Sequence, residues 1–349
     1  MYRCANWEKS KERLQLSQGY AWSTDQGRTW ESDLSRPALF PKLSQDEAEI
    51  NGTASGSKLI DYAIGCIEDP RLFRFEGQVY MTTACRMFAP GPYWEHDEPT
   101  QCAPTWIRGK HTLGRAATEN ITVSVLYRVN LDALVAEKYE DAFQYMGNLT
   151  APEMGENRDV VLFPERLEID GKKQIVCLHR PWNPRTYPGL KDVELPSIVG
   201  CYAERFEDLG RSTAPQFLLA SPRFDWEGDR IGASGQLVKI SNHRWLVSYH
   251  GKKDSTVGYT QSFMIVDSAE GGVPRVIHRC PERILFAQED WEMPGTFKTP
   301  VVFITGVELI GSELLVAYGA ADEKIGVARI DFEQLLETIS KYDANGKTV

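Results

Sequence analysis

Four segments of the chain repeat one pattern of hydrophobic and polar residues. Each begins with an alternating apolar run, continues through a turn with Gly or Asn, and ends in a second apolar run that closes on polar residues. Alternation with a period of two predicts β-strands, and the turn joins each pair of strands into a hairpin. The predicted hairpins are Leu72–Ala84, Leu167–Arg180, Leu237–His250 and Val307–Asp322.

The hairpins recur at a nearly constant spacing. Their first residues are separated by steps of 95, 70 and 70 residues. The longer first step contains the proline-rich stretch Phe88–Pro99, and we interpret the segment 85–119 around it as an insertion loop. A hairpin that returns at such a period, flanked by further short strands, is typical of the blades of a β-propeller.

Residues Ser23–Trp30 match the S-x-D-x-G-x-T-W pattern of an Asp-box. In this hairpin turn the Asp25 side chain accepts backbone N–H bonds, Gly27 supplies a positive φ, and Trp30 packs beneath the turn. Asp-boxes lie on the outer strands of propeller blades, so the motif predicts one blade before the first hairpin. We therefore expect an all-β fold, a five-bladed β-propeller that uses residues 1–349 as a single domain.

Helical periodicity, with apolar residues three and four positions apart, occurs over a full window at two places. It predicts helices at Leu131–Phe143 and Asp331–Tyr342. The second segment lies near the end of the sequence, so we expect a short C-terminal helix after the last blade.

The charge balance argues against polyanionic partners. The 349 residues include 39 Lys and Arg against 49 Asp and Glu, a net charge of −10, without a basic run. We therefore expect neither nucleic acid nor a membrane surface as a partner. Residues Met1–Lys9 lack the apolar stretch of a signal peptide, and no segment approaches the ~20 apolar residues of a membrane helix. These features predict a cytoplasmic protein.

The cysteines and histidines show no pattern of a metal or cofactor site. The seven cysteines are scattered without a C-x-x-C pair, which argues against a zinc site or a disulfide framework. We expect most of them to be buried apolar residues. The six histidines lack metal-ligand spacing, and serine-hydrolase, nucleotide-binding and zincin motifs do not occur. The sequence therefore predicts no metal and no cofactor.

Charged residues lie at matching places around the hairpins. Asp69 precedes the first hairpin, Arg158 and Arg230 precede later ones, and Arg180 and His250 end second strands. Inner strands of successive propeller blades run along one axis, so residues at equivalent ends converge on a central pocket. The repeat therefore places one carboxylic acid beside four cationic groups.

Four basic groups at one place on an acidic protein predict a bound oxyanion, either phosphate or a substrate carboxylate. The alternative is that each Arg pairs locally, with Asp159, Asp229 or Glu165, and only ties the blades together. His179 lies on the strand face opposite to Arg180, where we expect a packed histidine rather than a catalytic one.

Six short blocks give the chain a specific resemblance to a known family. The blocks occur in order and are Ile67–Leu72, Asn157–Glu165, Leu178–Pro181, Arg230–Ala233, Tyr249–Gly251 and Tyr318–Asp322. Together they resemble glycoside hydrolase family 130, the inverting β-mannoside phosphorylases and related β-mannosidases on a five-bladed propeller. The resemblance covers the chain from about Trp22 to Arg329.

The resemblance implies a role for each matching residue. Asp69 of the Glu-Asp-Pro-Arg block is the general acid, which in this family relays its proton to the glycosidic oxygen through a hydroxyl of the mannosyl ring. The phosphate-binding residues are Arg158, Arg180, Arg230 and His250. The substrate-binding residues are Arg3, Glu68, Arg71 and Asp322. Among these, Asp322 belongs to the −1 subsite.

Three features depart from the family pattern. Arg158 and Arg230 replace the commoner Lys, which keeps the charge but changes the geometry of the donors. Family members have an inner strand with an Asn-rich loop before the strand that here ends at Arg3, so we expect an incomplete N-terminal blade. The insertion loop, with Trp94 and Trp106, is expected to cap the +1 subsite or to cover the propeller face.

These features favour phosphorolysis of β-mannosides, such as manno-oligosaccharides or mannosyl-glucose, to α-mannose 1-phosphate with inversion. Inorganic phosphate is then the co-substrate and nucleophile, so the protein needs one acid and an anion site. The first alternative, a β-mannosidase of the same family, needs Glu165 or Glu156 as a base roughly 6.5–9.5 Å from the acid. A non-catalytic glycan-binding propeller is the second. Linkage, acceptor sugar and assembly into a homo-oligomer stay open.

Overall fold

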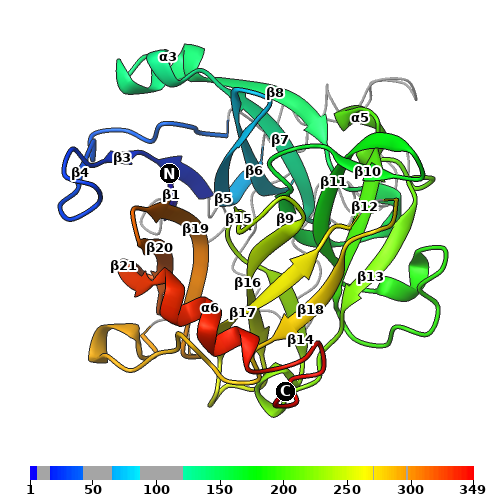
Figure 1. The fold of residues 1–349 in the computed structure, drawn as a ribbon. Helices are drawn as coiled ribbons and strands as arrows, with labels where there is room; N and C mark the ends of the chain where they lie inside the picture. Colours follow the sequence, from blue (N-terminus) through cyan, green and yellow to red (C-terminus); the bar gives the residue numbers. More distant parts are fainter. Residues whose placement is uncertain (6–15, 42–64, 87–120, 270, 296–297) are drawn as a thin grey trace, which may run out of the picture. The chain divides into compact units, whose positions relative to one another are not determined.

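The computed structural model describes residues 1–5, 16–41, 65–86, 121–269, 271–295 and 298–349. Over these residues the fold is all-β, a propeller-like succession of antiparallel sheets with a short helix near the C-terminus (Figure 1). The chain divides into two compact units. Unit 1 comprises Met1–Thr24, Thr29–Arg158 and Leu209–Thr213, and unit 2 comprises Asp25–Arg28, Asp159–Asp208 and Ala214–Val349. The single domain over 1–349 stays a prediction.

Unit 1 contains the first predicted hairpin, which is confirmed as strands β5 and β6. Glu76 and Gly77 form the turn between them, both with positive φ, as a two-residue hairpin turn requires. The strands are β1 (Tyr2–Ala5), β2 (Leu16–Gly19), β3 (Ala21–Trp22), β4 (Glu31–Ser32), β5 (Cys66–Phe75), β6 (Gln78–Arg86), β7 (Val123–Val129) and β8 (Phe143–Asn148). β5 to β8 form a four-stranded sheet, whereas β1–β2 and β3–β4 are sheets of two strands.

The helix predicted at Leu131–Phe143 is only partly correct. Two short helices, α3 (Leu131–Val135) and α4 (Tyr139–Ala142), replace it, and a 3-10 turn, η4 (Pro152–Met154), follows β8. Glu137 lies between the two helices with a φ of 57°, which is incompatible with a continuous α-helix. Both helices pack their buried residues into the core of the β5–β8 sheet.

Unit 2 contains three larger sheets and confirms the other three predicted hairpins, as β10–β11, β15–β16 and β19–β20. The first sheet has β9 (Asn157–Leu162), whose first two residues belong to unit 1, β10 (Leu167–Ile169), β11 (Lys172–Pro181), β12 (Ile198–Ala203) and β13 (Gln216–Ala220). The second has β14 (Arg230–Ala233), β15 (Val238–Lys239), β16 (Arg244–Lys252), β17 (Tyr259–Asp267) and β18 (Arg275–Arg279). The third has β19 (Val302–Ile310), β20 (Glu313–Ala320) and β21 (Lys324–Asp331).

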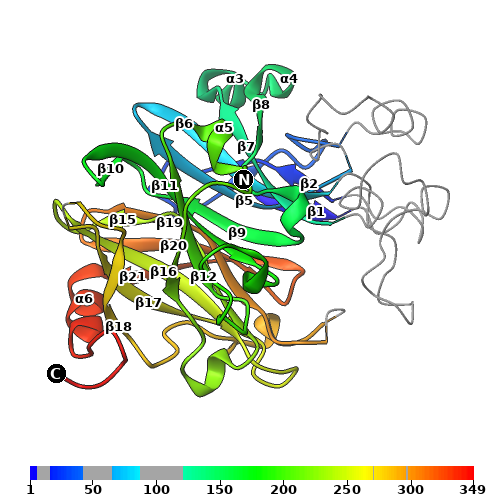
Figure 2. The same cartoon turned by 90° about the vertical axis from the view of Figure 1, so that its right-hand side faces the viewer.

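The predicted C-terminal helix is confirmed as α6 (Phe332–Ser340), beside β18 in Figures 1 and 2. Asp331 caps it by accepting a hydrogen bond from the Gln334 amide at 2.9 Å. Its apolar face, with Phe332 and Ile339, is buried in the core of the third sheet. The remaining helices are α5 (Phe206–Leu209), η5 (Pro184–Thr186), η6 (Asp225–Glu227) and η7 (Asp290–Glu292).

Among the described residues, four sheets have three or more strands, one fewer than the five predicted blades. Before the first hairpin, residues 1–5 and 16–41 form two sheets of two strands each, and the strands of the Asp-box hairpin β3–β4 are two residues long. The turn itself is as predicted, since the Arg28 amide donates to Asp25 at 3.0 Å and Gly27 has a φ of 81°. Trp30 is less enclosed than predicted, since its side chain is 46% exposed.

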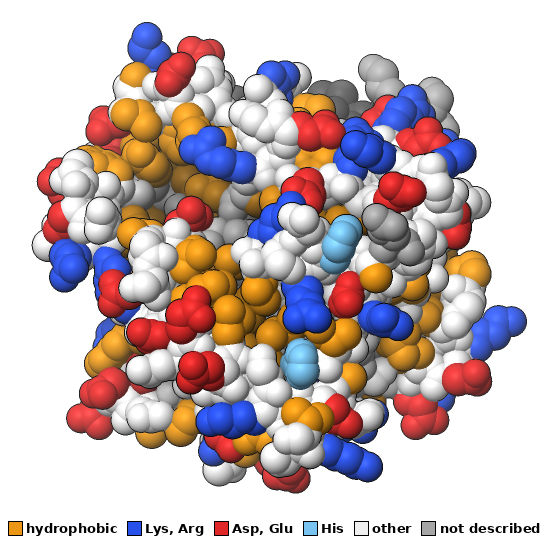
Figure 3. Space-filling model, viewed as in Figure 1, with side chains coloured by type: hydrophobic (Ala, Val, Ile, Leu, Met, Phe, Trp, Pro, Cys, Tyr) orange, Lys and Arg blue, Asp and Glu red, His pale blue; other side chains and the backbone are white. Residues whose placement is uncertain are grey.

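The remaining predictions about the surface concern charges, cysteines and the insertion loop. On the face shown in Figure 3, the described Lys and Arg side chains are interspersed with Asp and Glu and form no continuous basic patch. Five of the six described cysteines are buried, as expected. No helix within the described part of the chain is long and apolar enough to cross a membrane. The insertion loop lies outside the described residues, apart from Cys85 and Arg86, which end β6.

Candidate active site

Strand β5 of unit 1 carries the Glu-Asp-Pro-Arg block at a β-bulge. Its pairing with β6 shifts between Glu68 and Arg71, so that one extra residue is inserted in β5. Asp69 lies in the bulge with a φ of 51°, a left-handed conformation that Asp tolerates better than most residues. The following Pro70 has no N–H that would need a partner in the sheet. The bulge explains why consecutive carboxylates, Glu68 and Asp69, both approach Arg3.

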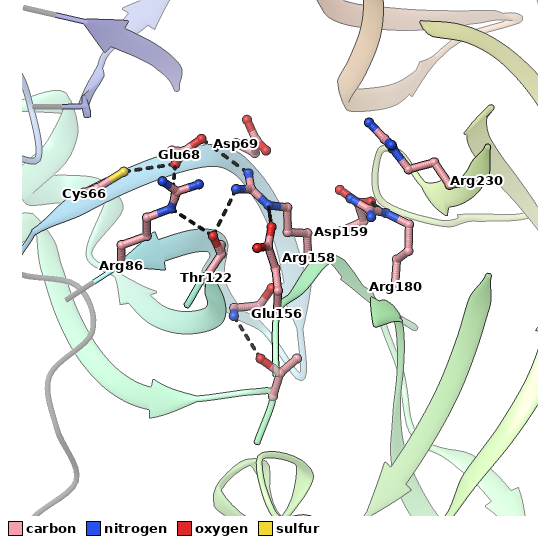
Figure 4. A network of polar contacts seen from close by, with 12 residues as sticks. Cys66, Glu68, Asp69, Arg86, Thr122, Glu156, Arg158, Asp159, Arg180 and Arg230 are labelled. Carbon is pink, nitrogen blue, oxygen red and sulfur yellow. Dashed lines mark hydrogen bonds and ion pairs between the residues drawn. The ribbon is translucent and has the colours of Figure 1, made fainter. Parts of the chain in front are cut away.

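Glu68 is buried and surrounded by cationic groups (Figure 4). Its carboxylate lies 3.4 Å from Arg158 and 3.9 Å from both Arg3 and Arg86. The Cys66 thiol donates to it at 3.0 Å. Burial alone would raise the pKa of Glu68, but the three guanidinium groups outweigh burial and lower the pKa to about 2. Glu68 is therefore ionised at every pH at which the protein is expected to work.

The pKa of Asp69, the next residue, is shifted in the opposite direction. Burial raises its pKa, Arg3 at 3.7 Å counteracts part of this, and the negative charge of Glu68 raises the pKa again, so the net shift is upward. Two neighbouring carboxyls whose environments push their pKa values apart are typical of an acid and its ionised neighbour. Of the two carboxyls, Asp69 is therefore the one that holds a proton more readily.

Arg158 and Arg71 hold this arrangement in place. Arg158 donates from Nε to Glu156 at 3.0 Å and from Nη2 to the Thr122 hydroxyl at 3.0 Å, in addition to its contact with Glu68. Arg71 is almost completely buried and donates to the backbone carbonyl of Asp69 at 3.1 Å. Arg71 therefore supports the strained backbone of the bulge, rather than lying open to a substrate.

A second group of charged residues lies in unit 2 around Asp159. This carboxylate, 1% exposed and at a φ of 61°, accepts a hydrogen bond from Arg180 at 2.5 Å and lies 3.5 Å from Nε2 of His250. Gly232 is the cross-strand partner of His250, and a Cβ there would meet the His250 ring at 2.5 Å and also clash with Asp159. Gly232 is therefore required for the carboxylate and the imidazole to come this close.

Arg230 lies two residues before Gly232 on β14 and is held differently. It donates to the Tyr259 hydroxyl at 2.5 Å, and its guanidinium carbon lies 5.2 Å from the Trp182 ring centroid and 5.3 Å from that of Tyr259. Its distance to the Asp229 carboxylate is 3.9 Å. The Tyr259 ring also contacts His250, with 5.9 Å between ring centroids, and so connects Arg230 with the Asp159 group.

Three further candidate residues also belong to unit 2. Asp322 is exposed in the turn after β20, with a φ of 60°. Glu165 is bound by Lys239 at 2.6 Å, so it is occupied by a surface ion pair. His179 is buried and within 2.8 Å of Gln216, and burial lowers its pKa to about 4, which confirms a packed, neutral histidine.

The structure thus brings the predicted residues together in two groups. Unit 1 gathers Arg3, Glu68, Asp69, Arg71 and Arg158, and unit 2 gathers Arg180, Arg230 and His250. The local pairing given as the alternative is present for Arg180, through Asp159, and for Arg230, through Asp229 at 3.9 Å. Arg158 pairs instead with Glu68 and Glu156.

Sequence reasoning missed several members of these groups. Arg86 and Thr122 lie outside every family block, and nothing in their spacing marks them. Trp182 directly follows the Leu-His-Arg-Pro block, which was a usable signal. The sequence predicts Asp159 only as a local partner of an Arg, although the residue lies inside a family block and next to Arg158.

Comparisons with known proteins match the chain to β-mannoside phosphorylases and their family. The family model of glycoside hydrolase family 130, described as β-1,4-mannooligosaccharide phosphorylase, matches residues 105–341. The β-1,2-mannobiose phosphorylase of Listeria innocua is 27% identical over 289 residues, or 78% of this chain and 75% of that protein. The β-1,4-mannooligosaccharide phosphorylase of Ruminococcus albus is 27% identical over 199 residues, or 54% of this chain and 52% of that protein.

A solved structure extends the likeness to the fold. The β-1,2-mannobiose phosphorylase from Listeria innocua in complex with β-1,2-mannobiose has a TM-score of 0.62 at 20% identity, covering 94% of this chain and 70% of that chain. Both curated relatives are named phosphorylases, which confirms the predicted class of enzyme. The family match spans more than half of the chain and includes Arg158, Arg180, Arg230, His250 and Asp322. The protein therefore belongs to glycoside hydrolase family 130.

Proposed function

We propose that the protein catalyses inverting phosphorolysis of β-mannosides, with inorganic phosphate as co-substrate and no cofactor. The observation that carries this proposal is the pair of neighbouring carboxyls on β5, in which Glu68 is kept ionised and the pKa of Asp69 is raised. A phosphorylase needs one acid, because phosphate is its own nucleophile. The pair provides that acid.

In the proposed reaction, Asp69 gives its proton to the departing glycosidic oxygen, by way of a mannosyl hydroxyl as the family resemblance implies. A phosphate oxygen attacks the anomeric carbon from the opposite face while the bond to the glycosidic oxygen breaks. The products are α-mannose 1-phosphate and the shortened acceptor. Arg3, 3.7 Å from Asp69, stabilises the carboxylate that proton transfer leaves behind.

The proposed phosphate site consists of Arg158, Arg180, Arg230 and His250. Arg158 and Arg230 have side chains that are 18% and 15% exposed, so they are the accessible cations of the four. Arg180 and His250 are buried against Asp159, and Arg180 adds positive charge to the proposed site. The hydrolase alternative is less well supported, since both of its candidate bases, Glu165 and Glu156, are engaged by cations.

The proposed substrate contacts are divided by burial. Arg3 is partly exposed and Asp322 is exposed, so both are suited to bind mannosyl hydroxyls. Glu68 and Arg71 are buried at 6% and 2% exposure, and we assign them to the support of Asp69 rather than to direct contact with the sugar.

We also propose that the complete fold is a five-bladed propeller in which the N-terminal strands contribute to the fifth blade. Two observations support this assignment. The likeness to a solved family structure covers 94% of the chain. In addition, Arg329 of β21 donates to the carbonyl of Gln26 in the Asp-box turn, which associates that turn with the sheet β19–β21.

The test of the function is a phosphate-dependence assay. β-1,2-Mannobiose is the first substrate to use, because a relative that matches over 289 residues is named a phosphorylase of that disaccharide, and β-1,4-mannobiose is the second. We expect release of a sugar phosphate only when phosphate is present. Free mannose at equal rates without phosphate would establish a hydrolase, and no release from any β-mannoside under either condition would establish a glycan-binding protein.

A further inference from the structure

Arg230 differs from the other cations of the proposed phosphate site in the groups that hold it. Arg180 is bound by Asp159 at 2.5 Å, and Arg158 lies 3.4 Å from Glu68 and closer to a second carboxylate. The carboxylate oxygen of Asp229 is 3.9 Å from Arg230, and the same oxygen accepts a hydrogen bond from Lys252 at 2.7 Å. The charge of Arg230 is therefore the least neutralised of the three guanidinium charges.

Two aromatic side chains contact Arg230, in addition to the Asp229 carboxylate at 3.9 Å. Trp182 follows the end of β11 and Tyr259 begins β17, so the rings come from two different strands. The guanidinium carbon lies over both rings, at 5.2 and 5.3 Å from their centroids, and the Tyr259 hydroxyl accepts a hydrogen bond at 2.5 Å. Such contacts fix a planar cation through the quadrupole of the rings and leave its net charge unchanged.

The hydrogen-bonding groups of Arg230 lead to the same conclusion. Within the described residues its buried Nε has no acceptor, although a buried donor is usually paired. A guanidinium group presents five N–H donors in a rigid fork that matches phosphate oxygens. A carboxylate at short distance would compete with phosphate for these donors, whereas an aromatic ring does not.

We propose that Trp182 and Tyr259 are positioning residues that hold Arg230, with its charge only weakly neutralised, in the correct orientation for inorganic phosphate. This inference rests on the proposed phosphorolysis, in which Arg230 contacts the co-substrate. Neither ring touches the reacting atoms in this scheme. Both act through the guanidinium of Arg230 and set the affinity for phosphate rather than the affinity for the mannoside.

The experiment compares steady-state kinetics of Trp182→Ala and Tyr259→Phe with the wild-type protein, with β-mannobiose and inorganic phosphate varied in turn. Loss of one cation–π contact or of the hydroxyl acceptor is expected to raise the KM for phosphate about tenfold. The kcat and the KM for mannobiose are expected to stay within about twofold, because neither residue contacts the sugar. Trp182→Phe, which keeps a ring, is expected to restore most of the phosphate affinity.

Trp30→Ala is the matched control, since Trp30 is 46% exposed in the Asp-box turn and Trp182 is 51% exposed. It should change neither KM. Thermal melting of each variant checks that the fold is retained, and calorimetric titration with inorganic phosphate measures the same affinity without turnover.

The outcomes separate this inference from the proposed function. If the wild-type protein releases no sugar phosphate, the proposed function fails. If the wild-type protein is phosphate-dependent but both variants keep its KM for phosphate, the aromatic positioning of Arg230 is wrong. A rise in the KM for mannobiose alone would also overturn the inference, because Trp182 would then be a sugar platform.

Discussion

Unit 1 and unit 2 differ in the ratio of cationic side chains to the carboxylates that neutralise them and in the kind of side chain that holds each cation. In unit 1, three guanidinium groups converge on one buried carboxylate, Glu68. In unit 2, the carboxylate of Asp159 serves Arg180 and His250, and Arg230 is held by aromatic rings. Excess positive charge around Glu68 keeps it ionised beside a carboxyl with a raised pKa, whereas the arrangement in unit 2 leaves a cation available.

The comparison shows that residues at equivalent places in a sequence pattern can have different functions in the structure. Arg158 and Arg230 are both predicted as phosphate ligands and both replace a commoner Lys. In the structure, Arg158 contacts Glu68 and Glu156 and contributes to the low pKa of Glu68. Among the described residues, Arg230 contacts neither carboxyl of the pair on β5. We therefore expect changes in unit 1 to act mainly on proton transfer and changes in unit 2 to act mainly on phosphate.

The largest effect is expected from Asp69→Asn. The amide keeps the shape and the left-handed backbone preference of Asp69 but has no proton to give, so kcat should fall by roughly 10²–10⁴-fold. Phosphorolysis of mannobiose measures the loss, and calorimetric titration should show phosphate binding within about threefold of wild type. Undiminished turnover in a folded variant would remove Asp69 from the mechanism and the acid from unit 1.

Glu68→Gln should have the next largest effect and should move the pH profile. The substitution removes the negative charge of Glu68, which raises the pKa of Asp69. Arg3 and Arg158 are then no longer neutralised by Glu68 and lower the pKa of Asp69 further. Because the acid must be protonated, the decline of kcat/KM at high pH should then begin at a lower pH than in the wild type. We expect kcat at neutral pH to fall by about 10²-fold.

A pH profile that is unchanged in position would show that Glu68 does not tune Asp69. Asp33→Asn is a suitable control, because Asp33 accepts hydrogen bonds from Ser35 at 2.8 Å and Tyr139 at 3.3 Å and belongs to neither charged group. Its profile should coincide with that of the wild-type protein.

The smallest effect is expected from Gly232→Ala in unit 2. The added Cβ meets the His250 ring at 2.5 Å and clashes with Asp159, both of which are buried, so the free energy of unfolding should fall by about 1–3 kcal/mol. Denaturant unfolding measures it. Gly272→Ala is the control, since a Cβ there has no neighbour within 4 Å, and equal stability of the two variants would contradict the close contact.

The strands, and most members of the two charged groups, could be predicted from the sequence because both depend on local information. The alternation of apolar and polar residues in Leu72–Ala84 predicts the hairpin that β5 and β6 form. The Glu-Asp-Pro-Arg block contains both members of the carboxyl pair. The boundaries were less predictable. The apolar spacing from Leu131 to Phe143 is helical throughout, yet the backbone at Glu137 divides the segment.

The remaining features depend on partners that are distant in sequence. Trp182 and Tyr259 lie 77 positions apart, and only the pairing of different strands brings both rings to Arg230. Arg86 contacts Glu68 because β5 and β6 are paired, a contact that no motif encodes. Burial is also a property of the whole fold, which is why Glu68 and Arg71 resembled substrate ligands in sequence but are enclosed in the structure.

Three acidic residues of the candidate site, Asp69, Asp159 and Asp322, have φ values of 51°, 61° and 60°. These left-handed backbone conformations limit which substitutions test the chemistry of the carboxylate alone. Asn and Gly adopt such backbone readily, whereas Ala, Val or Glu would add conformational strain of order 1–3 kcal/mol to any loss of the carboxylate. In a saturation library, tolerance at these positions will therefore reflect two selections at once, and comparison of Asn with Ala at each position separates charge from backbone.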